Sequence, residues 1–122
     1  MTMKEELIQL KDNLSALKDR IEAEYKSAKE QCKSLGGNAQ DVCEEEAKGR
    51  EKVGKAELDF RKDGSESNRH NVAKAKADAA YEVAKEKCDD QSGNAKDVCE
   101  ADAKAAHVKA LEEAKVDRAA NS

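Results

Sequence analysis

Four cysteines are the residues of this sequence that could most readily do chemistry. They form two pairs, Cys32 with Cys43 and Cys88 with Cys99, and ten residues separate the members of each pair. Structural zinc sites usually place paired ligands two to four residues apart, and thiol-redox pairs follow a Cys-x-x-Cys pattern. The spacing fits neither motif, so we expect the cysteines to form disulfide bonds.

The two histidines offer no further reactive arrangement. His70 lies beside a polar break in the sequence and His107 in a polar stretch, so we expect both to be solvated surface residues. The chain also has no glycine-rich phosphate loop and no serine, histidine and aspartate arrangement that we can place. We therefore predict that the protein is not an enzyme, with no catalytic residue and no cofactor.

Carboxylates gather close to the predicted bends. Residues 44–46 are glutamates, and Asp89, Asp90 and Asp102 lie around the second bend. These positions are not shared between the two halves of the chain, and a helix dipole favours negative side chains near a helix start in any case. We therefore predict no metal site. A metal-binding or thiol-redox protein that uses the cysteines or the acidic bends is the alternative.

The sequence contains an internal repeat. A shift of 56 positions superimposes residues 25–48 on residues 81–104, and 14 of the 24 residue pairs are identical. The identities include both cysteines of each segment and a Gly-Asn-Ala-x-Asp-Val-Cys motif. Because a repeated segment forms one supersecondary unit, we expect both copies to have the same structure.

A turn signal lies midway between the cysteines of each copy, Gly-Gly-Asn at residues 36–38 and Ser-Gly-Asn at residues 92–94. Glycine adopts the left-handed conformation that ends many helices, and asparagine caps the start of the next. An aspartate three residues after each asparagine occupies the capping-box position. The predicted caps are Asn38, Asp41, Asn94 and Asp97.

In an antiparallel hairpin, the two cysteines of each copy stand about one helical turn from the bend and at similar height. Alanines continue the same stripe away from the bend, and small side chains permit the close helix approach that a disulfide requires. These alanines are Ala28, Ala47, Ala84 and Ala103. We predict the disulfides Cys32–Cys43 and Cys88–Cys99. The alternative is a twin-cysteine hairpin, in which each pair lies along one continuous helix and the pairs are bridged to each other.

The composition favours long helices over disorder. The 122 residues include no proline and 21 alanines, but only 17 Leu, Ile, Val and Phe residues together, so the core must be thin. We predict an all-α protein of two tandem disulfide-stapled antiparallel helical hairpins, whose four helices form an elongated bundle. The predicted helices span residues 3–35, 39–61, 68–90 and 95–120. The predicted organisation is a first hairpin with an N-terminal leucine-seam extension at 1–61, a hinge at 62–67 and a second hairpin at 68–122.

Large apolar residues recur in the first predicted helix at alternating spacings of three and four, which is a heptad seam. They are Met3, Leu7, Leu10, Leu14, Leu17 and Ile21. One interpretation is packing within the chain, on Val53, Phe60 and the later helices. The other is a coiled-coil contact with another chain.

The charge pattern limits the classes of partner. The chain carries 23 basic and 27 acidic residues, for a net charge of −4, and it has no basic stripe that would attract nucleic acid or anionic lipid. No apolar run reaches the ~20 residues of a membrane span. We therefore expect no nucleic-acid partner and no membrane span, and instead a protein partner or self-association through helix faces.

Several segments resemble a family of small, uncharacterised, Ala- and Lys-rich, four-cysteine helical proteins of β-proteobacteria, some of which are labelled TolA-like. They are Asp-Arg-Ile-Glu-Ala-Glu-Tyr-Lys-Ser-Ala-Lys-Glu-Gln-Cys at residues 19–32, the two Gly-Asn-Ala-x-Asp-Val-Cys segments, and Ala-Asp-Ala-Ala-Tyr-Glu-Val-Ala-Lys-Glu-Lys-Cys-Asp-Asp at residues 77–90. The resemblance covers about residues 19–115 and implies a periplasmic location, because family members usually begin with a cleaved signal peptide. Residues 1–18 depart from that pattern by carrying the leucine seam, so a cytoplasmic location is the alternative. The family supplies no catalytic residues.

Together these features predict a non-enzymatic periplasmic helical protein with a structural or interaction role, and a relation to stress is part of this expectation. The alternatives are the metal-binding or thiol-redox protein and a coiled-coil assembly module.

Overall fold

The computed structural model describes residues 3–121, and the side chains of residues 13–115. Its elements are four helices, α1 (Met3–Cys32), α2 (Gly37–Lys62), α3 (Glu66–Cys88) and α4 (Gly93–Asn121). No strand occurs within this described range. The predicted all-α fold is therefore confirmed, and each predicted helix matches an observed one with boundaries that differ by a few residues.

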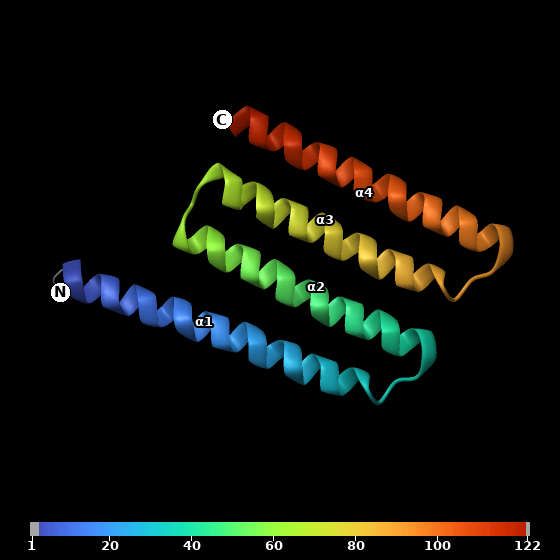
Figure 1. Ribbon diagram of the computed structural model, residues 1–122, viewed down its shortest axis with the longest axis horizontal. Coiled ribbons are helices and arrows are strands. Elements are labelled where there is room, and N and C mark those ends of the chain that lie inside the picture. The colour runs from blue at the N-terminus through green and yellow to red at the C-terminus, as the bar shows by residue number, and fades with distance from the viewer. Residues whose placement is uncertain (1–2, 122) are drawn as a thin grey trace.

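The four helices lie side by side in chain order as one antiparallel layer (Figure 1). Between residues 3 and 121, each helix contacts only its neighbours in the chain: α1 packs on α2, α2 on α3, and α3 on α4. The elongated bundle is thus open. Because no second layer covers the helices, both broad faces of the array are exposed to solvent.

The two hairpin bends are built in the same way. After Cys32 and again after Cys88, three successive backbone N–H groups donate to carbonyl oxygens three residues earlier, at 3.0 to 3.4 Å. These tight turns replace the last helical turn that we predicted, so α1 and α3 end at their cysteines. The next helix begins at Gly37 or Gly93, whose φ angles of 54° and 57° are in the left-handed region that glycine adopts without a steric penalty.

The contact between α1 and α2 includes leucine and isoleucine side chains. Leu58 and Ala47 of α2 are buried. A Cβ atom added at Gly54 would lie 3.3 Å from Cγ1 of Ile21, so the missing side chain makes room for the isoleucine. The helices therefore approach closely where the sequence alternates large and small residues.

The two hairpins pack together through α2 and α3, which share the most extensive helix contact of the molecule. Gly49 of α2 is buried against Ala79 of α3, and an added Cβ at Gly49 would lie only 2.9 Å from the alanine Cβ. This distance is shorter than real Cβ contacts. The glycine therefore sets how closely the two hairpins approach.

The corner between α2 and α3 is fixed by side-chain hydrogen bonds. Ser65 caps α3, because its Oγ accepts from the backbone N–H of Asn68 at 3.1 Å. The Asn68 side chain in turn donates to the carbonyl oxygens of Asp63 at 2.8 Å and of Asp59 at 3.3 Å, which ties the start of α3 to the end of α2. The non-helical residues are 63–65, a shorter break than the segment 62–67 expected from sequence.

The heptad seam lies on α1, and its described members Leu14, Leu17 and Ile21 are half-buried. Ile21 contacts Gly54, and Leu17 lies with Leu58 along the groove between α1 and α2. This part of the seam packs within the chain. This part lies beside Gly54 and Leu58. We predicted that the seam packs on Val53 and Phe60, but Val53 lines the next groove and Phe60 is exposed. The side chains of Met3, Leu7 and Leu10 lie outside the described residues.

Substituting Gly49 by alanine should destabilise the protein. Alanine is the better helix former by ~1 kcal/mol, but its methyl group would collide with Ala79, and overpacking typically costs about 1–3 kcal/mol. We expect a net loss in the free energy of unfolding, measured by urea denaturation monitored by circular dichroism. Gly64→Ala is the control, because an added Cβ there would meet only a carbonyl oxygen at 3.9 Å. Equal stability of both variants and the wild type would show that α2 and α3 are not in close contact.

Reduction of the disulfides should lower the melting temperature by tens of degrees. The staples close short loops, and each is expected to contribute about 3 kcal/mol, which is large beside the few kcal/mol that a thin core supplies. The second hairpin should lose hydrogen-exchange protection first, because the buried side chains between α3 and α4 are alanines and a cysteine, without the leucine and isoleucine of α1. A melting temperature unchanged by reductant would contradict this expectation.

Candidate functional site

The four cysteines form the two predicted disulfides. Cys32 bonds to Cys43 with a Cα–Cα distance of 5.5 Å, and Cys88 to Cys99 with a distance of 5.6 Å. No cysteine is free. The twin-cysteine alternative is therefore wrong, since it requires helices to run without interruption through both bends.

The alanines of the predicted stripe continue from these bridges along the helix contacts. Ala47 and Ala103 are buried, and Ala28 and Ala84 are half-buried. The disulfides therefore close the bend ends of two interfaces that small side chains extend.

The predicted asparagine caps are wrong. The helix α2 begins two residues earlier than an Asn38 cap allows, its N-cap residue is Gly36, and no side chain caps it. The Nδ2 group of Asn38 instead donates to the carbonyl oxygen of Glu86 at 2.6 Å, at the end of α3. Asn38 therefore joins the start of α2, in the first hairpin, to the last turn of α3, in the second.

The second predicted cap pair is displaced in the same way. Because α4 begins at Gly93, Asn94 is its second residue, and it is exposed. Asp41 and Asp97 lie beyond the first turn of their helices, which contains no acidic residue in either case. The glycines adopt helix-starting positions themselves, so the asparagines lie inside the helices.

Asn38→Ala should lower the free energy of unfolding by about 1 kcal/mol, the typical contribution of one hydrogen bond. The matched variant Asn94→Ala should leave it unchanged within about 0.5 kcal/mol, because this exposed residue follows the same motif without the inter-hairpin bond. Urea unfolding of both variants measures the difference. Equal losses at the two sites would show that both asparagines act as local helix caps.

The acidic bend residues meet across the hairpins. Partial burial and the negative charges of Asp89, Asp41 and Glu45 raise the pKa of Glu86. Repulsion of this kind makes the site receptive to positive charge. Even so, no group of three or more histidine, cysteine, aspartate or glutamate residues is arranged to hold a metal ion in the part of the chain that the structure describes.

We predicted that His107 is a solvated surface residue, and this prediction is wrong. It is half-buried on α4, its ring stacks on Tyr81 of α3 with 4.5 Å between ring centroids, and its Nε2 lies 2.8 Å from Oδ1 of Asp78. These three residues line a groove of about 320 Å³ on one broad face, together with Lys48 and Lys52 of α2. The histidine therefore serves as a polar contact that holds α4 against α3.

The aspartate of this contact titrates abnormally. Partial burial raises its pKa, but the hydrogen bond with His107 and the positive charge of Lys74 outweigh that effect, so the pKa of Asp78 lies below its ordinary value. The carboxylate is thus ionised near neutral pH and accepts the hydrogen bond from the imidazole. We did not predict this site, although the cysteine spacing contains a signal for it. Tyr81 and His107 lie seven and eight residues from Cys88 and Cys99, and hence at the same height along the hairpin.

His70 lies near the other end of α3 and is half-buried. Its Nδ1 atom and Oε2 of Glu66, one helical turn away, are buried and have no hydrogen-bond partner among the described residues.

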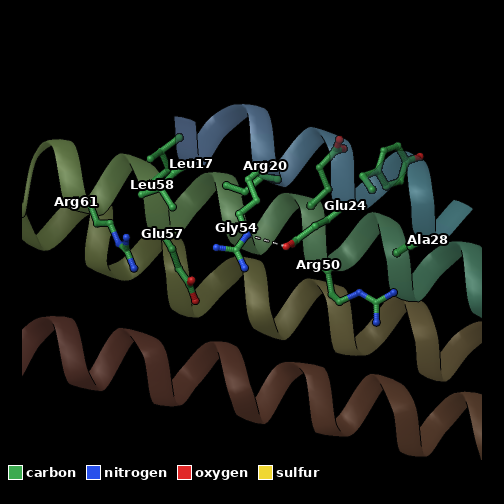
Figure 2. Close-up of a pocket in the computed structure, with 13 residues that line it drawn as sticks. Leu17, Arg20, Glu24, Ala28, Arg50, Gly54, Glu57, Leu58 and Arg61 are labelled. Atoms are coloured by element: carbon green, nitrogen blue, oxygen red, sulfur yellow. Dashed lines mark hydrogen bonds and ion pairs between the residues drawn. The ribbon is translucent and has the colours of Figure 1, made fainter. Parts of the chain in front are cut away.

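The opposite broad face carries two parallel grooves. The first lies between α1 and α2, has a volume of about 300 Å³, and is lined by apolar residues including Leu17, Ile21 and Leu58 (Figure 2). Arg20 and Glu24 stand at its α1 side and are joined by an ion pair of 3.0 Å (Figure 2). The groove therefore has an apolar floor and a charged rim.

The second groove lies between α2 and α3 and has a volume of about 440 Å³. Its floor is formed by Gly49, Val53, Ala79, Ala80 and Val83. It shares three residues with the first groove, which places the two on one face, separated by α2 alone. The shared residues are Arg50, Gly54 and Glu57.

Comparison of the chain with protein-family models, with curated proteins and with solved structures gave no match. None of the described helices is long and apolar enough to cross a membrane. The two disulfides favour an oxidising environment, since thiols are kept reduced in the cytosol. The described residues thus form exposed helix faces with grooves between neighbouring helices.

Proposed function

We propose that the protein is a non-enzymatic structural or interaction protein of the periplasm, which binds a protein partner through a broad face of its helix array. The observation that supports this proposal is the open single layer of helices. Within residues 3–121, every helix contacts only the helices next to it in the sequence. A helical domain normally buries its apolar surface against a second layer. Here the grooves that a second layer would fill are open on one face.

The scaffold behind this face is suited to binding. The disulfides fix both bends, Ser65 and Asn68 fix the corner, and Asn38 joins the two hairpins. A surface held in place in this way loses little conformational entropy when a partner binds. The rigidity supports an interaction role.

Three observations support the other parts of the proposal. The disulfides suit an oxidising compartment, and the resemblance to signal-bearing periplasmic proteins points to the periplasm. The net charge of −4 without a basic stripe disfavours nucleic acid as the partner. The groove that holds the polar contact of His107 with Asp78 is lined by no serine, threonine or cysteine, which disfavours a hydroxyl or thiol nucleophile activated by the histidine.

Site-specific photo-cross-linking in the source cells tests the interaction. A photoreactive amino acid replaces Ala80, an exposed residue of the groove between α2 and α3. The control position is Ala105, which is exposed on α4 and, by helical spacing, opposite to the residues that pack on α3. We expect a discrete cross-linked product from position 80 alone, with the linked peptides identified by mass spectrometry.

Equal labelling from both positions, or none from position 80, would contradict binding through this face. An enzymatic activity that is lost with one non-cysteine side chain would contradict the non-enzymatic role. Alkylation of intact cells before lysis tests the compartment, because disulfide-bonded cysteines stay unmodified. Alkylation of the four thiols would place the protein in a reducing compartment.

A further inference from the structure

The chain exposes more surface than a compact protein of its size. Its accessible surface is 8440 Å² at a mass of 13.3 kDa, whereas a compact monomer of that mass exposes roughly 6,500 Å². The excess is roughly 2,000 Å². A standard protein interface buries about 800 Å² of each partner, so the open layer has ample area for one stable contact.

The charges on the grooved face follow a regular pattern along α2. Glu46, Arg50, Glu57 and Arg61 recur at spacings of four, seven and four, which places them on one side of the helix. All four line the two grooves, and Figure 2 shows Arg50, Glu57 and Arg61 in one row along α2. The signs read negative, positive, negative, positive, with Gly54 beside the centre.

This pattern is complementary to itself when it is reversed. A two-fold axis midway between Val53 and Gly54 brings a second α2 across the first in the antiparallel direction. Arg50, four residues before Gly54, then meets Glu57, three residues after it, in the other copy. Glu46 and Arg61, eight residues before and seven after, meet in the same way. Each copy thus supplies the opposite charge at all four positions, as a symmetric interface requires.

The charges of the neighbouring helix α1 are complementary under the same two-fold axis. Arg20 and Glu24 of α1 flank the level of Ile21, which contacts Gly54. The same axis therefore places Arg20 of one copy near Glu24 of the other. Val53 and Val83 in the adjoining groove supply apolar area.

We infer that the missing second layer is a second copy of this chain, packed face to face with α2 antiparallel to α2 and centred between Val53 and Gly54. The inference rests on the proposed function, because it names the occupant of the same face. It predicts a homodimer whose stability depends on the pairing of Arg50 with Glu57 between copies.

Light scattering and sedimentation equilibrium of the oxidised full chain test the association. We expect twice the chain mass at concentrations on the order of 100 µM. Arg50→Glu and Glu57→Arg each create two like-charge contacts, and each should raise the dissociation constant at least about tenfold. Lys48→Glu is the matched control, because it reverses a charge of the same helix on the opposite face and should leave the dissociation constant unchanged. Circular dichroism verifies that each variant is folded.

Mixing the two variants gives the decisive result. The Arg50→Glu chain is acidic at both positions 50 and 57, and the Glu57→Arg chain is basic at both. In a heterodimer the two acidic residues of one chain therefore face the two basic residues of the other. The mixture should associate, while each variant alone stays monomeric. A monomeric wild type at concentrations on the order of 1 mM, or a mixture no more associated than its components, would overturn the inference. A cross-link from position 80 to a different protein, with a monomeric chain, would overturn it while leaving the proposed function intact.

Discussion

The register that the two disulfides impose is the constraint on which the structure depends. Each bridge joins two helices about one turn from their bend, with Cα atoms 5.5 and 5.6 Å apart. Only small residues tolerate so close an approach near the bridge, and Ala47 and Ala103 are buried there. Once the register is fixed, the stacking of His107 on Tyr81 and the contact of Ile21 with Gly54 follow from residue spacing.

The same constraint explains why the molecule forms a single layer. Interfaces built from alanine and glycine bring neighbouring helices close, but they bury little large apolar area. The larger side chains, such as Leu17 and Val53, line grooves and are half-buried, instead of filling a central core. Covalent staples and the polar corner supply rigidity that a deeper core would otherwise provide, and they leave the broad faces of the array open.

The two halves of the chain share a motif but differ in how they use it. Asn38 donates to Glu86 in the other hairpin, whereas Asn94, its counterpart, is exposed at the outer edge of the array. The difference arises because α2 has neighbours on both sides and α4 has only α3. Identical residues therefore contribute differently once the repeats are placed side by side.

The sequence by itself determined the helix content, the bends and the disulfide pairing, because these depend on local signals: the turn glycines, the cysteine spacing and the alanine-rich helices. It did not determine the roles of Asn38 and His107, since both depend on which helix becomes the neighbour and at what height. The packing of Gly49 on Ala79 and the open grooved face likewise were decided only by tertiary structure. Spacing along a chain fixes which side of a helix a residue occupies, but the partner across the interface is set by how the helices are ordered in space.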